Sequence, residues 1–398
     1  MKFIDLGLDP RILEGIDAMG YENATPVQQQ VMVPILEGKD IIAAAQTGTG
    51  KTAAFLLPLL HRLLTSPHHA GDINAMIIVP TRELAIQIAE SIEGLSYFTD
   101  VSSIAVYGGG DGNSFVTEKK ALTSGVDIVV CTPGRMIAHL NMGYVKLKGL
   151  KYLVLDEADR MLDMGFSDDL SKIVTFLPAL RQNLLFSATM PAKMRVLAKK
   201  LLHDPIEINI AISKPPEQIV QKAFIVYEAQ KVPIIIDMLS SKKFSKVIVF
   251  CSKKLNVKQL TLKLKHANLA VAEIHSDLDQ KSREQYLQDF RNQKINILVA
   301  TDVLSRGIDI DDIDLVINYD VPNDGEDYIH RIGRTARAAT SGTAFTLVSE
   351  NEQGKCGVIE QLLGAPIFKG TVPTEFGPTP AYNPKAIVKK ALIEGDNF

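Results

Sequence analysis

The 398-residue sequence contains only three cysteines and a net charge of only −3. Cys131, Cys251 and Cys356 lie far apart and form no CxxC pair, so they indicate no zinc site and fit a reducing cytoplasm. The small negative charge argues against a uniformly basic coat for nucleic acid, although it is compatible with a local basic groove. We therefore expect a cytoplasmic protein without a structural zinc ion.

Long apolar runs, short repeats and low-complexity tracts are also missing. No apolar stretch approaches the length of a membrane span. Asp5 and Asp9 interrupt the amino terminus, where a signal peptide needs an apolar core. Because 46% of the residues are hydrophobic and 22% are charged, the chain is neither disordered nor fibrous. Its length predicts two domains.

Short apolar segments alternate with amphipathic ones along the chain. Strands are expected at 40–45, 75–80, 103–109, 127–133, 152–159 and 183–189, and again at 246–252, 271–276, 295–302, 315–321 and 342–349. Such alternation predicts an α/β fold with parallel sheets and helices on both faces. The expected division is a first domain at 1–209, a proline-containing linker at 210–220, a second domain at 221–365 and an extension at 366–398 that is packed or frayed.

The stretch "AQTGTGKT" at 45–52 predicts a phosphate-binding loop, or P-loop, because it follows a predicted strand and opens an amphipathic helix. Glycines let the loop turn its N–H groups inward, and the helix N-terminus favours phosphate. Lys51 is expected to reach the β- and γ-phosphates, and Thr52 to ligate Mg²⁺. The predicted ATP-binding residues of the loop are Ala45, Gln46, Thr47, Gly48, Thr49, Gly50, Lys51 and Thr52, with Ala45 standing where the general pattern has glycine.

Three carboxylates follow the apolar run in "LVLDEADRML" at 153–162. The strand they follow and the P-loop strand should end at the same edge of a parallel sheet, where ligands bind. Asp156 therefore fits the acid that holds Mg²⁺, through water, and Glu157 fits the group that orients and deprotonates the attacking water. A solvated acidic turn is the alternative, but a P-loop already requires an acidic partner.

Asp159 has two possible relations to the "SAT" of 187–189. The hydroxyls of Ser187 and Thr189 could bond to it and transmit the state of the nucleotide. Alternatively, these two residues only cap the helix expected after Pro191. Local sequence does not choose between the two.

Several motifs occur in a fixed order: "AQTGTGKT", "PTRELA" (80–85), "TPGR" (132–135), "DEAD" (156–159), "SAT", "ATDVLSRGID" (300–309) and "HRIGRTAR" (330–337). The chain resembles a DEAD-box RNA helicase of helicase superfamily two, over nearly all of residues 1 to about 350. The resemblance implies two tandem RecA-like domains of the P-loop NTPase type. It also implies ATP and Mg²⁺ as cofactors, RNA as partner, RNA-dependent ATP hydrolysis and a monomer.

The resemblance further implies that Phe3 and Gln28 form and read an adenine pocket. A local alternative exists, because Thr25, Pro26 and Gln28 make a T-x-x-Q capping box with proline at the first helical position. Both can hold, since the helix start would present the glutamine.

The same resemblance places RNA contacts at Pro80, Thr81, Arg82, Gly109, Thr132, Pro133, Gly134, Arg135, Arg283 and Thr301. Alternatively, the threonines at helix starts act as helix caps. A helix start with a nearby arginine is a phosphate site, and contacts to phosphate and sugar carry no base sequence. Binding independent of RNA sequence is therefore expected. A lysine-rich stretch at 242–265 is either a further RNA contact or a solvated face.

In the second domain, the resemblance makes Arg334 and Arg337 arginine fingers on the γ-phosphate, and their spacing predicts one helical face. An ordinary pair of surface arginines is the alternative. Gly307 and Asp309 are expected at the nucleotide, while Asp302 and His330 join Asp159, Ser187 and Thr189 in interdomain coupling.

The predicted mechanism is closure of two domains around ATP and RNA, bending of the RNA strand, local unwinding of a short duplex, and release after hydrolysis. A nucleotide-switched RNA clamp and a DNA translocase stay open as alternatives, whereas the duplicated domain excludes a metabolic kinase. The sequence does not identify the RNA, the pathway or protein partners.

Overall fold

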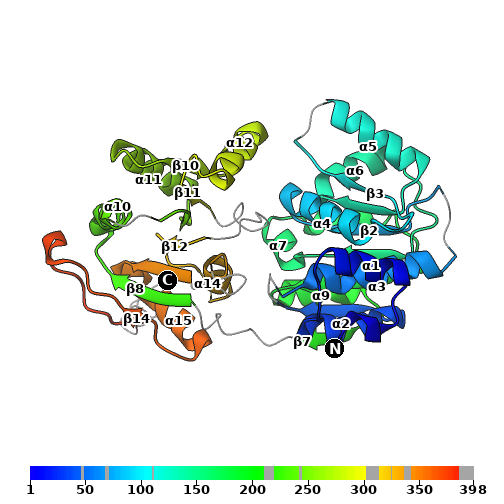
Figure 1. The fold of residues 1–398 in the computed structure, drawn as a ribbon, viewed down its shortest axis with the longest axis horizontal. Helices are drawn as coiled ribbons and strands as arrows, with labels where there is room; N and C mark the ends of the chain where they lie inside the picture. Colours follow the sequence, from blue (N-terminus) through cyan, green and yellow to red (C-terminus); the bar gives the residue numbers. More distant parts are fainter. Residues whose placement is uncertain are drawn as a thin grey trace, which may run out of the picture. The chain divides into compact units, whose positions relative to one another are not determined.

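The computed structural model describes residues 1–45, 49–67, 71–109, 112–209, 219–241, 244–301, 313–323, 325–335 and 342–384. The chain forms two compact units, Met1–Ile212 and Ser213–Phe398. Figure 1 draws the first in blue to green and the second in green to red. Each unit contains a parallel sheet with helices packed on it, which confirms the predicted α/β class.

The sheet of the first unit has the strand order β3-β4-β2-β5-β6-β1-β7, and all its pairs are parallel. Its strands are β1 Ile41–Ala44, β2 Ala75–Ile78, β3 Ser103–Val106, β4 Ile128–Cys131, β5 Tyr152–Leu155, β6 Gln182–Ser187 and β7 Ile206–Asn209. Its helices are η1 Phe3–Leu6, α1 Pro10–Ala18, α2 Pro26–Leu36, α3 Lys51–Thr65, α4 Arg82–Leu95, α5 Gly112–Ser124, α6 Pro133–Asn141, α7 Ala158–Asp163, α8 Ser167–Val174 and α9 Ala192–Leu201.

The sheet of the second unit has the order β10-β11-β9-β12-β13-β8-β14. Its strands are β8 Ile219–Ile225, β9 Val247–Phe250, β10 Val271–Ile274, β11 Ile297–Ala300, β12 Leu315–Asn318, β13 Gly342–Val348 and β14 Phe368–Lys369. Its helices are η2 Glu228–Gln230, α10 Lys231–Ser241, α11 Lys254–His266, α12 Gln280–Arg291, α14 Gly325–Ile332, η3 Glu350–Glu352, α15 Gln353–Leu363 and η4 Thr374–Phe376. When the strands of each unit are numbered from its own first strand, the two sheets have the same strand order. The fold is therefore duplicated.

The strands are short apolar runs because both of their faces are buried, as parallel sheets require. In β5, Tyr152 and Val154 join the core on one face, while Leu153 and Leu155 join the core on the other. Each predicted strand is present, although the observed ones end earlier. The predictions at 103–109 and 152–159 run past the ends of β3 and β5, because the chain turns there: Gly109 has a positive φ, Glu157 is left-handed, and α7 begins at Ala158.

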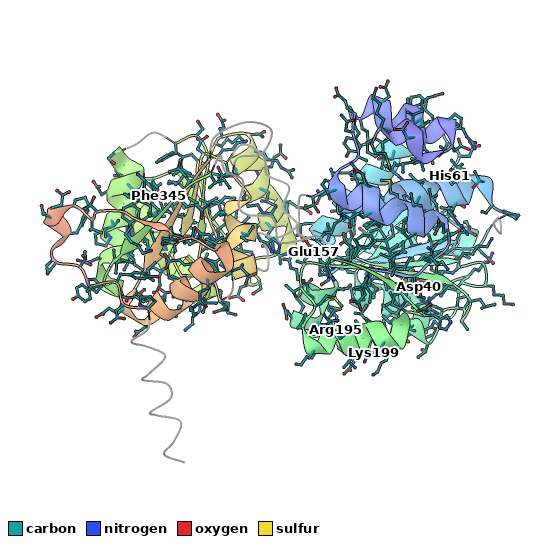
Figure 2. All side chains as sticks on the ribbon, turned by 90° about the horizontal axis from the view of Figure 1, so that it is seen from below. Asp40, His61, Glu157, Arg195, Lys199 and Phe345 are labelled. Atoms are coloured by element: carbon teal, nitrogen blue, oxygen red, sulfur yellow. The ribbon has the colours of Figure 1, made fainter. Side chains whose placement is uncertain are left out.

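A buried carboxylate joins the amino ends of β1 and β6. Asp40 accepts hydrogen bonds from the backbone N–H of Asn183 at 2.7 Å and from its side-chain amide at 3.0 Å. It also accepts from the N–H of His203 at 2.8 Å, and Figure 2 labels its position. The polar residues of the motifs lie at the opposite edge of the sheet, where the strands have their carboxyl ends.

One boundary differs from the expected division, and the extension takes one of its two expected forms. Strand β8 starts at Ile219, inside the predicted linker 210–220, because β-branched residues there pair with β13. The extension is packed as far as residue 384: β14 pairs with β8, and Tyr382 donates to Glu360 at 2.6 Å. Lys385, Lys389 and Lys390 lie outside the described residues.

The described part of the chain contains no helix with the length and apolar character needed to cross a membrane. The three cysteines are free thiols, and all of them are buried.

Candidate nucleotide and RNA site

The P-loop connects the end of β1 to the start of α3. Gly50 caps α3 with φ at +89°, a left-handed conformation that favours glycine, and a Cβ there would lie 2.5 Å from Nε2 of Gln28. Lys51 is buried, and its Nζ donates to the carbonyl of Ala45 at 2.7 Å. Thr52 lies in the first turn of α3. Gln46, Thr47 and Gly48 lie outside the described residues.

Asp156 follows β5 and is 3% exposed. Burial raises the pKa of its carboxyl to about 6; the charge of Lys51 opposes this rise and that of Glu157 adds to it. One of its oxygens accepts from the N–H of Glu157 at 2.9 Å. This environment suits a carboxylate that meets a cation, since a buried charge needs a partner of opposite sign.

Glu157 has a left-handed backbone, with φ at 49° and ψ at 47°, at the turn between β5 and α7. For a residue with a side chain this conformation costs about 1–2 kcal/mol, and such strain is concentrated at functional sites. Its Oε2 accepts from Nη1 of Arg160 at 2.9 Å, and both side chains are buried. Figure 2 labels Glu157. Arg160 was missed by the sequence analysis, although its three-residue spacing from Glu157 was a usable signal.

Asp159 contacts the 187–189 segment, in part through the expected hydroxyl of Ser187 and in part through backbone groups. One carboxylate oxygen accepts from the backbone N–H groups of Ala188 at 3.1 Å and Thr189 at 2.9 Å. Asp159 donates its own N–H to the hydroxyl of Ser187 at 3.3 Å. The expected bond between the Ser187 hydroxyl and Asp159 is therefore present, with the hydroxyl as acceptor, while Thr189 bonds to Asp159 through its backbone N–H.

The alternative that this segment caps the next helix is wrong. Pro191 is the cap of α9, and no side chain bonds to the first turn of that helix. Ser187 instead donates its hydroxyl to the carbonyl of Thr189 at 2.7 Å.

The predicted capping box at α2 is present and also reaches the P-loop. Gln28 accepts from the N–H of Thr25 at 2.8 Å and donates to the carbonyl of Gly50 at 3.1 Å. The Thr25 hydroxyl donates to the carbonyl of Thr49 at 2.8 Å. Phe3 is buried in the core of this unit, and the backbone beside it pairs with Asn23. The start of α2 is thus bonded directly to the loop expected to hold phosphates.

The residues expected at RNA in this unit follow β2, β3 and β4. Thr81, after Pro80, caps α4 by accepting from the N–H of Leu84 at 3.3 Å. Arg82 starts α4, and its guanidinium lies 4.6 Å from the centre of the Tyr107 ring. Gly109, after β3, has φ at +88°.

Arg135 has a matching environment at the start of α6. Thr132 precedes this helix, but its side chain makes no capping bond, so the capping reading is wrong there. Pro133 and Gly134 form the first turn, and Arg135 follows with its guanidinium 4.6 Å from the Phe115 ring centre. The aromatic partners of both arginines were missed, because the sequence gives no sign of which ring lies beneath which arginine.

The sheet order divides these residues into two groups along one carboxyl edge. Neighbouring strands β3, β4 and β2 precede the residues expected at RNA, and neighbouring strands β5, β6 and β1 precede those expected at ATP. Strand β6, which ends at Ser187, lies between β1 and β5. The 187–189 segment therefore lies between the P-loop strand and the strand of Asp156.

In the second unit, Arg334 is buried and lies beyond the end of α14 at Ile332. The prediction of one helical face for both arginines is therefore wrong for Arg334, because the chain leaves the helix and Thr335 pairs with Ile313. Arg337, Asp302, Gly307 and Asp309 lie outside the described residues. His330 is on α14 and is buried.

The other predicted RNA contacts of this unit are on β11 and α12. Thr301 follows β11, and Arg283 on α12 donates Nη2 to the carbonyl of Leu278 at 3.2 Å. In the lysine-rich stretch, Lys254 and Lys258 both pair with Asp277 at 2.8 Å. Their hydrogen bonds hold the pKa of Asp277 low, at about 2. These two lysines are thus partly neutralised by an acid that lies outside the stretch.

Comparison with known proteins decides the family. A model described as "DEAD/DEAH box helicase" matches residues 25–197, and one described as "Helicase conserved C-terminal domain" matches residues 230–339. The ATP-dependent RNA helicase CshA of Listeria monocytogenes is 43% identical over 361 residues, which cover 90% of this chain and 68% of the relative.

The chain belongs to the DEAD-box RNA helicase family. The DEAD-box ATP-dependent RNA helicase CshA of Bacillus cereus is 39% identical over 94% of this chain and 70% of the relative. Among solved structures, Dbp5 of S. cerevisiae, bound to RNA and ADP BeF3, matches with a TM-score of 0.82 and 30% identity over 99% of both chains. Mss116, bound to ssRNA and UDP-BeF, matches with a TM-score of 0.80 and 29% identity over 93% of this chain and 79% of that one.

Proposed function

We propose that this DEAD-box ATP-dependent RNA helicase binds RNA backbone with its two units, separates short duplexes or remodels RNA–protein complexes, and hydrolyses ATP to release the RNA. The supporting observation is the division of one carboxyl edge into residues after β3, β4 and β2 and residues after β5, β6 and β1. A single rigid sheet then carries two ligand sites side by side. The neighbouring positions of the two groups favour coupling between them.

The residues present fit a magnesium site. No cluster of three or more acidic, histidine or cysteine side chains suited to a metal occurs in the described ranges, which agrees with a Mg²⁺ ion held mainly by phosphate and water. Asp156, through water, and Thr52 would hold it, since Asp156 is a carboxylate only 3% exposed and a buried charge needs a partner of opposite sign. When bound, Mg²⁺ supplies neutralisation of phosphate charge.

The chain's own residues have separate tasks in hydrolysis. Lys51 exchanges the Ala45 carbonyl for phosphate oxygens. Glu157 uses Oε2 to bind Arg160, so that Oε1 is the oxygen directed to water, which it orients and from which it accepts a proton. Phe3 and Gln28 form the adenine pocket, and Gln28 connects that pocket to Gly50.

The second unit completes both sites in this proposal. Arg334 and Arg337 stabilise the charge that develops on the γ-phosphate, with Gly307 and Asp309 at the nucleotide. Arg283 and Thr301 contact RNA, while Asp302 and His330 couple the units to Asp159. Cytoplasmic location and a monomeric state belong to the same proposal.

Steady-state ATP hydrolysis tests this function. The purified chain is assayed alone, with single-stranded RNA and with single-stranded DNA, beside Glu157→Gln. We expect stimulation by RNA only, and a loss of about 100-fold or more in Glu157→Gln, because the base that accepts the proton is removed.

The other outcomes separate the alternatives. Equal stimulation by DNA would support a DNA translocase. Strong RNA-dependent hydrolysis without separation of a short labelled duplex would support an RNA clamp, in which hydrolysis sets only the residence time. Absence of stimulation by either polymer would contradict the proposal.

A further inference from the structure

Arg135 is held in a specific orientation by side chains of α5. Its Nε donates to Oε2 of Glu118 at 2.6 Å, and its guanidinium lies over the ring of Phe115. The Arg135 side chain is 16% exposed and that of Glu118 is 6% exposed. A charge-assisted hydrogen bond in such a buried place is stronger than one in water and fixes the donor geometry.

A second helix braces Glu118. The same oxygen, Oε2, lies 2.7 Å from Nε2 of His139, a residue of α6 that is fully buried. The His139 ring stacks on Phe115 with 4.4 Å between centres and 14° between planes, and its Nδ1 contacts the hydroxyl of Tyr144. The carboxylate is therefore the middle member of a chain of hydrogen bonds that runs from Tyr144 to Arg135.

Glu118 is the anionic member of this chain of hydrogen bonds. Burial raises the pKa of its carboxyl, but hydrogen bonds from His139 and Arg135 outweigh that effect and hold the pKa below its ordinary value. An ionised carboxylate with two donors gives Arg135 a single well-defined acceptor.

The pairing uses only one edge of the guanidinium. Nε is bound to Glu118, whereas Nη2 is buried and has no acceptor among the residues that the structure describes. An unsatisfied donor is costly, and because the Arg135 side chain is 16% exposed, an acceptor supplied from outside can reach the Nη edge of the guanidinium. A phosphate oxygen of RNA matches the remaining edge in charge and geometry.

We propose that Glu118 is a positioning residue for RNA binding: braced by His139, it holds Arg135 through Nε and presents the Nη edge to an RNA phosphate. The inference rests on the proposed contact between Arg135 and RNA. Its rival is competition, in which Glu118 neutralises Arg135 and weakens RNA binding. The two differ in sign, because removal of the carboxylate weakens binding in the first case and strengthens it in the second.

The test measures the RNA concentration that half-maximally stimulates ATP hydrolysis by the full chain. The variants are Glu118→Ala, Glu118→Gln, Arg135→Gln and the double variant Glu118→Ala with Arg135→Gln. Glu207→Ala is the matched control, because it also removes a carboxylate that faces an arginine, Arg195, at 3.9 Å. Glu207 is on β7, the edge strand of the same sheet that is far from β3 and β4. Basal hydrolysis without RNA and the melting temperature are recorded for each variant.

We expect Glu118→Ala to raise the half-saturating RNA concentration about 10-fold, since a hydrogen bond to a charged group is lost. Glu118→Gln keeps an acceptor of the same shape but not the charge, so a rise of about 3-fold is expected. Maximal stimulated rate and basal hydrolysis should stay unchanged, as should every property of Glu207→Ala. In the Arg135→Gln background, Glu118→Ala should have no further effect, because its influence passes through that arginine.

Each contrary result has one meaning. A lower half-saturation in Glu118→Ala would establish competition and overturn the inference. An equal loss with and without Arg135 would show that Glu118 acts on the fold alone, and would also overturn it. No effect of Arg135→Gln itself would refute the proposed RNA contact, a separate failure. If Glu118→Ala does not fold, Glu118→Gln is compared instead, with and without Arg135→Gln. An unchanged RNA concentration for half-maximal stimulation in Glu118→Gln would then contradict the positioning role.

Discussion

At the scale of single residues, the nucleotide site carries a carboxylate whose environment opposes its charge. Because folded Asp156 keeps its proton up to about pH 6 and the unfolded carboxyl loses its own near the ordinary pKa of 3.8, unfolding releases a proton between these values. Stability without ligands should therefore fall as the pH rises through this window and stay low above it. When no cation or nucleotide is bound, the charge on Asp156 therefore lowers the stability of the fold at neutral pH.

Asp156→Asn should relieve this cost. The amide oxygen can still accept from the N–H of Glu157, but it carries no buried charge. At pH 8 without nucleotide, we expect the free energy of unfolding to rise by about 2–3 kcal/mol, which follows from a pKa of about 6 against 3.8. ATP hydrolysis should be abolished. Urea unfolding at pH 8 and at about pH 4 measures the effect.

The gain must shrink toward about pH 4, where the wild-type carboxyl is protonated in both states. An equal gain at both values would mean that packing, and not charge, is responsible.

Some contacts of these residues could be predicted from local sequence patterns, and others could not. The capping box of Thr25 and Gln28 was predictable, because its partners are three positions apart. The bond of Gln28 to Gly50 and the stacking of Arg135 on Phe115 were not, since residues distant along the chain meet only after the sheet forms. The Asp159 contact was predicted only in part: the Ser187 hydroxyl bonds to it, but the bonds from the N–H groups of Ala188 and Thr189 were not predictable, because backbone N–H groups leave no sequence signature.

At the scale of elements, a buried lysine joins segments of the second unit. Lys231, the first residue of α10, is fully buried and contacts Glu352 at 2.7 Å, Glu228 at 3.0 Å and Asp320 at 3.8 Å. These acids come from η3, η2 and the end of β12. This cluster was not predictable from the sequence, since Lys231 and Glu352 are 121 positions apart.

Lys231→Met should destabilise the second unit by about 3–5 kcal/mol, because it leaves the carboxylate of Glu352, which is only 14% exposed, without its cation. Lys254→Met is the matched control: Lys254 pairs with Asp277 on the surface, and its loss should cost less than about 1 kcal/mol. Differential scanning calorimetry of both variants compares them. A similar shift in the two variants would contradict a special role for burial.

At the scale of the whole molecule, the sequence predicted the class of fold, the strands and the repeated architecture. The identical order of strands in the two sheets was beyond it, because strand order depends on pairing between distant segments. That order is what brings 187–189 between the P-loop and Asp156. Through 187–189 it also places Asp159 beside the strands that precede the residues proposed to bind ATP.

Coupling between ATP and RNA is reciprocal, so each ligand should strengthen the other by the same factor, typically about 5- to 150-fold. Asp159→Asn should reduce both factors equally, toward unity. The substitution places an amide where a carboxylate accepts from the N–H groups of Ala188 and Thr189. The single amide oxygen cannot accept both from the N–H of Arg160 and from those of Ala188 and Thr189, and it carries no charge, so the 187–189 segment is held to α7 more weakly. The residues proposed to touch either ligand are unchanged.

Fluorescence titrations measure this directly: labelled RNA with and without a non-hydrolysable ATP analogue, and labelled analogue with and without RNA. Asp163→Asn, an exposed residue of the same helix, serves as control and should keep wild-type coupling. In Asp159→Asn, each ligand alone should bind within about 3-fold of wild type, because a residue outside both sites adds no direct contact energy. Retained coupling in this variant would place the link between the two sites elsewhere, since the same free energy must appear in both titrations.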